Sequence, residues 1–403
     1  MPKSTEFPED AIVRDSIRSL FPLGKLPPTK NTLVFDVENV KPSFVNALRR
    51  IILSDVETVG FYTEDYKTSS LRVIKNTSSL HNEFLLHRLS LIPINLPDPA
   101  SFNSERYEFV LKVQNNEESI IDVTTDDFKI RDRINNVDVN TRLLFPHDPI
   151  TGDPVLITRL KSNPGSEGEM IHIEGGCIKG SGKDNALFSP VSCAIFVNKV
   201  DTDKLDQALQ VYLNENKGNK EELTNKFMIE EKERYFYVDE NGEPDRFTFT
   251  IESIGVIPPN VILIRALDIL SKKLTMFESE INKIMDNIES DIVEIEKAQT
   301  VMEAYDIVIQ NETHTLGNFM QEYMMEFGDN TKLKFVGYMN PHPLQKKIVL
   351  RVALHNVTNP VEITNEIIDV TKRMKAMIRL MREKVVKEIG SEEPKKKVVK
   401  KKK

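Results

Sequence analysis

The residue type best suited to acid–base chemistry occurs at His314, within the stretch "NETHTLGNFMQEYMMEF" (311–327). A histidine between two threonines could serve as a general base or as a metal ligand. However, no cysteine, serine–aspartate pair or second histidine lies near it in the sequence. Thr313 and Thr315 are both suitable residues to cap the N-terminus of a helix. The stretch therefore predicts the start of a helix rather than a catalytic loop.

A second candidate is the glycine-rich stretch "GGCIKGSGKDN" (175–185), which contains "GSGK". A phosphate-binding loop requires the pattern GxxxxGK[ST] between a strand and a helix. Here Lys183 is followed by Asp184, whose carboxylate would repel a phosphate, and no amphipathic helix follows. The stretch predicts a surface loop.

The remaining metal-ligating residue types are poorly spaced. His81 and His87 are six positions apart, which is not the i, i+4 spacing of ligands on a helix. The segment "TTDDFKIRD" (124–132) pairs carboxylates without a DxDxD pattern. The two cysteines, Cys177 and Cys193, are too few for a disulfide framework or a four-cysteine zinc site. We therefore expect no catalytic residue and no metal site in this chain.

The composition is that of an acidic protein. The chain has 403 residues, of which 39% are hydrophobic, and a formal net charge of −8. An acidic total argues against a chain whose main surface binds nucleic acid. No apolar run approaches the ~20 residues that span a bilayer, and residues 1–20 lack the pattern of a signal peptide. We expect an intracellular protein, located in the nucleus or the cytoplasm, with no membrane partner.

A lysine-rich segment, "PKKKVVKKKK", occupies residues 394–403. Three interpretations stay open for it. The segment can be a solvated tail, a nuclear-import signal, or an electrostatic contact with nucleic acid.

Hydrophobic periodicity predicts an α+β chain. Alternating apolar residues predict strands, and apolar residues spaced three or four apart predict amphipathic helices. Strands are expected at 31–40, 191–198, 246–253, 304–310, 332–338 and 347–354. Helices are expected at 41–55, 259–297, 311–327 and 360–389. Residues 57–189 consist of short alternating runs separated by turn residues, which predicts a β-rich block.

The pattern occurs twice. When Asn318 is placed over Asn46, Asn311 lies over Asn39, and the apolar positions of the two predicted helices coincide. These positions pair Phe44, Ala47, Leu48, Ile51 and Ile52 with Leu316, Phe319, Met320, Tyr323 and Met324. Each copy then continues with two strands and a long helix. The β-rich block interrupts the first copy after its first helix.

Matching apolar faces predict that the two copies pair pseudo-symmetrically. The residues expected at the interface between the modules are Phe44, Leu48, Ile51, Leu316, Phe319, Met320 and Tyr323. The predicted domains are an N-terminal arm (1–30), a first module (31–56 and 190–298), a β-rich insert (57–189), a second module (301–390) and a basic tail (391–403).

Both copies contain segments that resemble a known family. In the first copy these are "VENVKPSFVNALRRIILSDVETVGF" (37–61), "NEFLLHRLSLIPI" (82–94) and "FTIESIGVIPPNVILIRALDILSKKL" (249–274). They resemble the third-largest subunit of eukaryotic RNA polymerase II, the archaeal D subunit and the bacterial α subunit. In the second copy, "ETHTLGNFMQEYM" (312–324) and "VGYMNPHPLQKKIVLRV" (336–352) resemble the eleventh subunit of that polymerase and the archaeal L subunit.

The resemblance implies two dimerisation modules of the α-subunit N-terminal type. It also implies a non-catalytic subunit that carries the largest and second-largest subunits of a DNA-dependent RNA polymerase and lies beside small zinc-bearing subunits. Nucleic acid would be reached only through the complex. Magnesium and zinc would be held by other subunits. Some cellular relatives bind a metal through a cysteine cluster in the insert, but Cys177 is the sole cysteine there, so we expect no zinc or iron–sulfur site in this chain. The fusion of both modules in one chain resembles the polymerases of large DNA viruses, in which case the location is a viral factory or a virion.

One difference between the copies indicates where a partner binds. Arg49 and Arg50 align with Gln321 and Glu322, and identical packing would not explain opposite charges at one position. We expect the arginines, with Asn46, His87 and Arg88, to face an external partner. The resemblance implies that this partner is the second-largest polymerase subunit. The alternative is that the two arginines cover the solvated side of their helix.

Two other functions compete with this interpretation. The long helices also fit a coiled-coil or β-rich scaffold protein unrelated to transcription. An enzyme that uses the loop at 175–185 is the other possibility, and nucleotide binding by the isolated chain would favour it.

Overall fold

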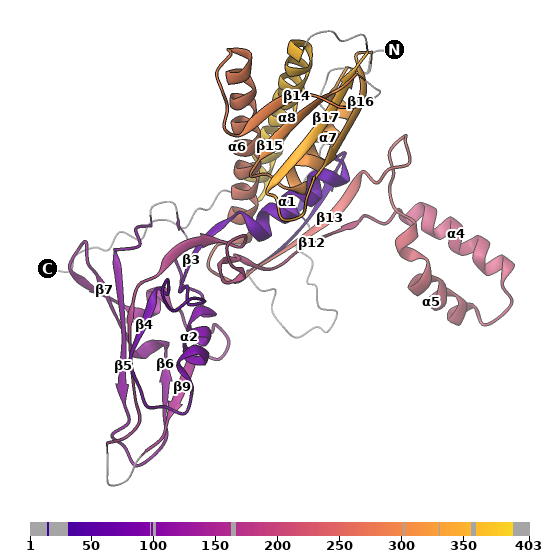
Figure 1. Cartoon of the computed structure of the whole chain (residues 1–403). Coiled ribbons are helices and arrows are strands. Elements are labelled where there is room, and N and C mark those ends of the chain that lie inside the picture. The colour runs from indigo at the N-terminus through magenta and orange to yellow at the C-terminus, as the bar shows by residue number, and fades with distance from the viewer. Residues whose placement is uncertain are drawn as a thin grey trace. The chain divides into compact units, whose positions relative to one another are not determined.

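The computed structural model describes residues 14–15, 31–96, 98–99, 102–162, 167–300, 303–329, 331–355 and 360–389 (Figure 1). The described residues belong to two compact units. One unit comprises residues within 1–51, 193–251 and 263–392, and the other comprises residues within 52–192 and 252–262. Apart from Arg14–Asp15, the predicted arm (1–30) lies outside the described residues, as does the predicted tail (391–403).

The first module is a four-stranded sheet with two helices. Its strands are β1 (Arg14–Asp15), β2 (Thr32–Glu38), β12 (Val191–Asn198) and β13 (Arg246–Ser253), in the order β1-β2-β13-β12. Its helices are α1 (Pro42–Ser54) and α6 (Pro259–Met285). Pro42 occupies the first position of α1, where its fixed φ suits a helix and its missing N–H has no intrahelical partner to lose.

The second module repeats this arrangement. Its strands are β14 (Val293–Lys297), β15 (Tyr305–Gln310), β16 (Leu333–Met339) and β17 (Lys347–Leu354), in the order β14-β15-β17-β16. Its helices are α7 (His314–Phe327) and α8 (Pro360–Ile389). All strand pairs in this sheet are antiparallel. The predicted α+β fold class, with two similar modules and a β-rich insert, is confirmed.

The two strand-to-helix turns show how closely the copies correspond. In the alignment of the repeat, β2 and β15 end at equivalent residues, and α1 and α7 begin at equivalent residues. Asn39 and Asn311, which the alignment superposes, have positive φ angles of 58° and 61°. Asparagine tolerates this left-handed conformation better than most residues because its short side chain can bond locally. The paired asparagines therefore fix the same turn in both modules.

One predicted helix is too long. The sequence predicts a helix over 259–297, but α6 ends at Met285. Asn287 has a φ of 58°. The N–H groups of Asn287 and Ile288 donate to the carbonyls of Ile284 (3.0 Å) and Lys283 (2.9 Å), which is the pattern of a Schellman cap. Beyond this point the apolar residues Ile288, Ile292 and Ile295 still have the spacing that is typical of a helix, although the helix has already ended.

The residues after this cap belong to the second module rather than to the first. The predicted first module extends to 298, but β14 is hydrogen-bonded to β15 in the sheet of the second module. β14 lies beside β15 in the place that β1 takes beside β2. The boundary between the modules therefore lies in the turn after Met285, and each module begins with an edge strand.

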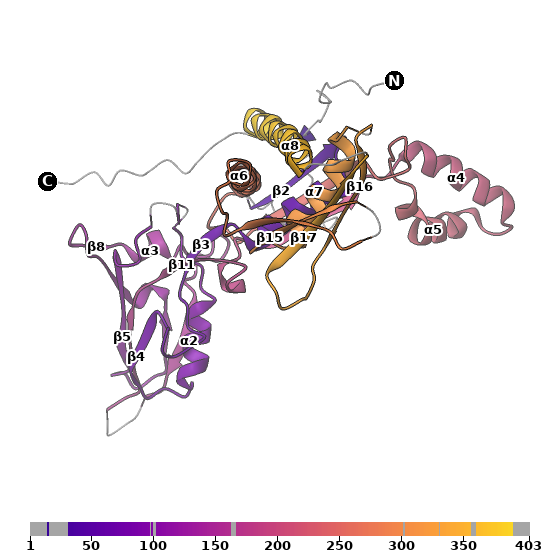
Figure 2. The same ribbon diagram turned by 45° about the horizontal axis from the view of Figure 1, so that its top comes forward.

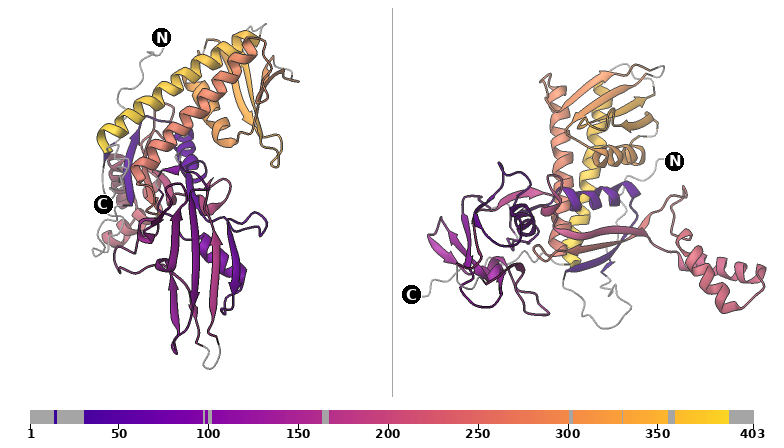
Figure 3. Two further views of the ribbon diagram at one scale, coloured as in Figure 1. Left: turned by 90° about the vertical axis from the view of Figure 1, so that its left-hand side faces the viewer. Right: turned by 60° about the horizontal axis from the view of Figure 1, so that its bottom comes forward.

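The long helices α6 and α8 lie side by side and run antiparallel (Figures 2 and 3). Two ion pairs join them. Asp268 bonds Arg382, with 2.6 Å between Oδ1 and Nε, and Glu278 bonds Lys375. Their apolar stripes are buried, for example at Leu274 and Met374. Neither α6 nor α8, nor any other helix in the described part of the chain, is both long and apolar enough to cross a membrane.

The insert forms the core of the other compact unit. Its five-stranded sheet has the order β4-β10-β5-β7-β8, and smaller sheets pair β3 with β11 and β6 with β9. The strands are β3 (Glu57–Gly60), β4 (Leu71–Asn76), β5 (Tyr107–Gln114), β6 (Ile121–Thr124), β7 (Phe128–Asp132), β8 (Val137–Val139), β9 (Leu156–Leu160), β10 (Met170–Gly175) and β11 (Ile178–Ser181), with helices α2 (Asn82–Ser90) and α3 (Thr141–Leu144). Four buried rings, Phe61, Phe109, Phe128 and Phe145, pack together at centroid distances of 5.0 to 6.3 Å.

A short helical pair is inserted between β12 and β13. Helices α4 (Thr202–Glu215) and α5 (Lys220–Glu230) bury a small cluster of their own, built on Leu205, Leu209 and Phe227. The corresponding connection in the second module, between β16 and β17, contains no helix. The two modules thus differ most at this connection and at the β-rich insert.

Candidate functional site

The centre of the module pair is formed by α1 and α7. Phe44 on α1 contacts Phe319 on α7, with 5.9 Å between the ring centroids, and Phe319 packs against Tyr323 at 4.9 Å. The seven residues predicted for the module interface are each 2% exposed or less. Most of the apolar faces that the sequence repeat aligns are therefore buried between the sheets and the helices of this unit.

Two polar contacts cross between the helices in a pseudo-symmetric way. The backbone N–H of Ser43 donates to Oε2 of Glu322 at 2.9 Å. The Nε of Arg50 donates to Oγ1 of Thr315 at 2.6 Å. In the repeat alignment, Thr315 is the counterpart of Ser43 and Glu322 is the counterpart of Arg50. An interface with two-fold symmetry produces such reciprocal contacts, in which residue i meets j and j meets i.

These contacts change the interpretation of the opposite charges at Arg50 and Glu322. The sequence indicates that identical packing would not explain them, and the packing of the two residues is indeed different: Glu322 meets a backbone N–H and Arg50 meets a hydroxyl, both within this chain. Glu322 accepts a bond at the N-terminus of α1, where the helix dipole favours an anion. Arg50 instead meets a hydroxyl oxygen, which accepts a hydrogen bond from a guanidinium.

Arg49 has a different environment from Arg50. Its Nε and Nη2 donate to Oδ1 of Asn46, one turn earlier on α1, at 3.1 and 2.9 Å. The side chain is half-buried. This local contact orients both residues on α1 and leaves Arg49 available to a partner, whereas Arg50 is engaged with α7.

An ionic cluster lies at the start of α1. The ammonium group of Lys41 is 2.7 Å from Asp239 and 3.6 Å from Glu326. Burial lowers the pKa of Lys41, but the hydrogen bond to Asp239 and the charges of Glu326, Asp239 and Glu322 outweigh it, so the pKa lies above its usual value. The backbone N–H of Lys41 donates to the hydroxyl of Tyr323 at 3.3 Å, and burial raises the pKa of Tyr323. The Lys41 ammonium is thus held charged by the carboxylates of Asp239, Glu326 and Glu322.

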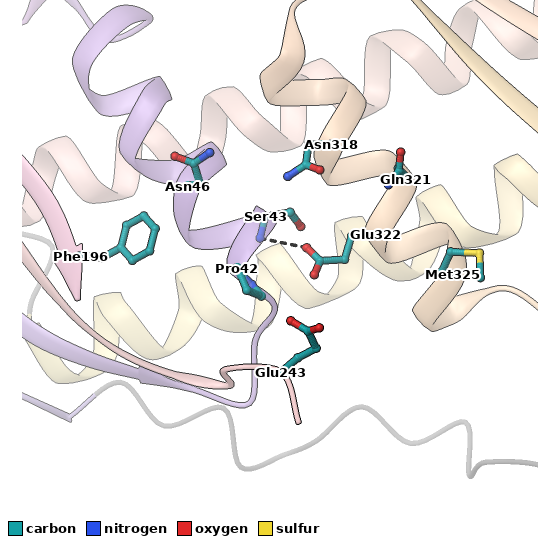
Figure 4. Close-up of a pocket in the computed structure, with 9 residues that line it drawn as sticks. All are labelled: Pro42, Ser43, Asn46, Phe196, Glu243, Asn318, Gln321, Glu322 and Met325. Carbon is teal, nitrogen blue, oxygen red and sulfur yellow. Dashed lines mark hydrogen bonds between the residues drawn. The ribbon is translucent and has the colours of Figure 1, made fainter. Parts of the chain in front are cut away.

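A pocket of about 540 Å³ opens between α1 and α7 (Figure 4). Its lining residues are Pro42, Ser43, Asn46, Phe196, Glu243, Asn318, Gln321, Glu322 and Met325. Asn46 and Asn318 are one of the two pairs of asparagines that the repeat alignment superposes. Of the polar residues that line this pocket, only Asn46 is predicted from the sequence as a docking residue. The equivalence of Asn46 and Asn318 was the signal that could have led to the others.

His87 and Arg88 belong to the other compact unit. Both are exposed on α2. Arg88 donates from Nε to the carbonyl of Ile157 (2.8 Å) and from Nη2 to the carbonyl of Leu156 (2.9 Å), so its guanidinium bridges α2 and β9. His87 lines a pocket of about 740 Å³ within its own unit, together with Tyr66, Leu86 and Leu91 among others.

The other residues considered for catalysis, phosphate binding or metal binding contribute to the local structure instead. His314 is the exposed first residue of α7, at the helix start that the sequence predicts, and of the two candidate threonines Thr313 is the N-cap. The glycine-rich stretch forms β11 and a turn in which the Asp184 carboxylate accepts from the Ser181 N–H (3.0 Å) and hydroxyl (2.8 Å). Among the described residues, no three His, Cys, Asp or Glu side chains gather as a metal site requires.

Cys177 should be chemically inert in the folded chain. It is 1% exposed, and burial raises the pKa of its thiol to about 12. At pH 8 only about one thiol in ten thousand would then be the thiolate, which is the form that reacts and binds metals. We expect iodoacetamide at pH 8 to modify half-buried Cys193 first and Cys177 only after unfolding in urea, as read by peptide mass spectrometry. Rapid labelling of Cys177 in the native chain would contradict the buried position.

Comparisons with known proteins agree with this architecture. The chain matches the RNA polymerase Rpb3/Rpb11 dimerisation domain family over residues 34–274 and again over 304–380. It is 26% identical over 339 residues to subunit RPAC1 of DNA-directed RNA polymerases I and III from Bos taurus, covering 70% of this chain and 92% of that protein.

Two further relatives come from plants and fungi. One is subunit 3 of DNA-directed RNA polymerases II, IV and V from Arabidopsis thaliana, which is 26% identical over 288 residues and covers 60% of this chain and 85% of the relative. The other is subunit RPB3 of DNA-directed RNA polymerase II from Schizosaccharomyces pombe, 26% identical over 282 residues with 63% and 85% covered. With two matched dimerisation domains in one chain, the protein belongs to the Rpb3/Rpb11 dimerisation-domain family and is an α-like RNA polymerase subunit.

Proposed function

We propose that this chain is the assembly platform of a multisubunit DNA-dependent RNA polymerase and takes no direct part in catalysis. The observation that carries the proposal is the reciprocal contact of α1 and α7 within one chain, at Ser43–Glu322 and Arg50–Thr315. Separate α-like chains would have to dimerise before binding a partner. Here the pair is formed by folding, so the platform does not depend on the protomer concentration.

The proposed partners are the largest and second-largest polymerase subunits, with small zinc-bearing subunits beside them. Magnesium and zinc would be held by those subunits, with no cofactor in this chain. DNA and RNA would be contacted only through the complex. We propose a location in the nucleus or the cytoplasm. The fusion of the two modules supports an origin in a large DNA virus, in which case the location is a viral factory or a virion. The comparisons lend no support to the alternative of a scaffold unrelated to transcription.

We propose that the second-largest subunit docks on Asn46 and Arg49 of α1 and on His87 and Arg88 of α2. Arg50 is the neighbour of Arg49 on α1 and belongs to the same proposed surface. Arg49 is the sharpest probe of this surface. Its contact in the described structure is with Asn46 on its own helix, so changing it leaves the α1–α7 contacts in place. Arginine suits the role because its planar guanidinium can bond a carboxylate through two parallel hydrogen bonds.

Arg49→Glu is expected to reduce capture of the second-largest subunit by at least about tenfold while the chain stays folded. A close charge pair at an interface contributes on the order of 1.5 kcal/mol or more, and reversal adds repulsion. Capture can be measured by co-expressing the tagged chain with that subunit and quantifying the recovered ratio in moderate salt. Thermal melting should match that of the parent within a few degrees.

The matched control is Lys272→Glu, which makes the same charge change at an exposed position of α6. It should leave capture at the parental level. If Arg49→Glu and Lys272→Glu both capture the subunit as well as the parent does, Arg49 has no docking role. If the parent itself captures neither of the two largest subunits, the platform function is wrong.

A further inference from the structure

The pocket between α1 and α7 presents hydrogen-bond donors on one side. Oδ1 of Asn46 already accepts from Arg49, which leaves its Nδ2 as a donor. Oε1 of Gln321 accepts from the backbone N–H of Tyr338 at 2.9 Å, which leaves its Nε2 as a donor in the same way. Because their oxygens are occupied, the orientation of both amides is fixed by their surroundings. Figure 4 shows the Asn46 and Asn318 amide groups directed toward the space between the helices.

The opposite side of the pocket carries acceptors. The Glu322 carboxylate uses Oε2 for the N–H of Ser43, which leaves Oε1 able to accept. Glu243 is exposed at the pocket margin, and its carboxylate makes no ion pair with any described residue. The two carboxylates are flanked by Phe196, Pro42 and Met325, which supply apolar surface.

Ser43 gives independent evidence that the pocket takes a ligand. The residue is 2% exposed, and its hydroxyl has no hydrogen-bond partner among the described residues. In Figure 4 this hydroxyl lies between α1 and α7, on the pocket side. A buried hydroxyl without a partner is costly, by about 1 to 3 kcal/mol, so a group from outside is expected to satisfy it.

We propose that this pocket binds a basic side chain of a partner polypeptide together with the peptide groups that flank it. The cation bonds Glu322 and Glu243. The carbonyls of the same peptide accept from the amides of Asn46, Asn318 and Gln321, and the Ser43 hydroxyl joins this network. An anion would meet two carboxylates, and a purely apolar group would leave at least four polar side chains unsatisfied. The proposal rests on the proposed function, because it supplies the chemistry by which a polymerase subunit would contact the module pair.

The test uses N-acetyl-L-argininamide, which combines a guanidinium with two peptide groups, and the full chain with 13C-labelled methionine methyl groups. Met325 lines the pocket, and its signal is assigned by its loss in Met325→Leu. We expect the Met325 signal to shift and saturate in the millimolar range, while that of buried Met374 stays unchanged. N-acetyl-L-citrullinamide, which has the same shape without the charge, should bind at least about fivefold more weakly.

Glu243→Gln should weaken N-acetyl-L-argininamide binding several-fold, and Glu289→Gln, the same change at an exposed position after α6, should not. Equal binding of the arginine and citrulline probes, stronger binding of N-acetyl-L-aspartamide, or no shift of Met325 would each overturn the proposal. These outcomes are separable from the platform function. A chain that binds the arginine probe but captures no polymerase subunit would refute the platform alone, whereas normal capture without probe binding would refute the pocket alone.

Discussion

Leu48→Asp and Met320→Asp are each expected to prevent stable folding of the module pair. Both side chains are fully buried, with 0% exposure, on the facing helices α1 and α7. An unpaired carboxylate at such a site costs several kcal/mol, either as a buried charge or through protonation. A domain is stable by only about 5–15 kcal/mol, so one such change removes a large part of the total. Thermal melting and size-exclusion chromatography should show a lowered midpoint, by 10 °C or more, or aggregation.

The control for this pair is Met276→Asp, on α6, where the methionine is 51% exposed. It introduces the same carboxylate into a helix without burying it, and its effect should stay within about 0.5 kcal/mol. Were Leu48→Asp and Met320→Asp to melt like Met276→Asp, the apolar faces of α1 and α7 would have to be solvated, and the paired arrangement would be wrong.

Short-range patterns in the sequence were sufficient to predict the two modules. The apolar residues of α1 and α7 recur at helical spacing, and Asn39 and Asn311 occupy the same turn in both copies, so the repeat is visible without coordinates. The end of α6 was missed because Ile288, Ile292 and Ile295 continue the spacing of three and four residues. The Asp286–Asn287 pair was the available signal, since asparagine commonly ends a helix in the left-handed conformation.

The site was harder to predict because its contacts are distant in the chain. Nothing in the local sequence indicates that the N–H of Ser43 meets Glu322, or that Arg50 meets Thr315, since each pair is joined only by the packing of the modules. The repeat alignment singled out Arg49 and Arg50, but it could not separate the arginine that bonds its own helix from the one that bonds α7. The repeat also makes Ser43 equivalent to Thr315, and together with the equivalence of Arg50 and Glu322 this indicates that contacts between the two helix starts occur in reciprocal pairs.

Glu322→Arg should destabilise the chain more than Arg50→Glu does, although the two positions are equivalent in the repeat. Glu322→Arg removes the acceptor for the Ser43 N–H and places a cation at the positive end of α1, next to the charged Lys41. Loss of the charge-assisted bond and the new repulsion should together cost about 2–3 kcal/mol. Arg50→Glu loses the bond to Thr315, but its carboxylate lies near the first turn of α7, where the helix dipole favours an anion and the Thr315 hydroxyl can donate. Its cost should be about 1 kcal/mol.

Urea unfolding at neutral pH measures both free energies, and Met276→Arg supplies the control for an added arginine at an exposed position of a helix, α6. Low salt should widen the difference between Glu322→Arg and Arg50→Glu, because the repulsion at the start of α1 is partly screened by ions. The double exchange Arg50→Glu with Glu322→Arg should remain less stable than the parent, since Lys41 stands at the start of α1 whereas its counterpart in the second copy, Thr313, is uncharged. Equal losses for the two single variants, or full recovery in the double exchange, would mean that the two helix starts are electrostatically equivalent and that the charge difference between the copies has no role in how the modules pair.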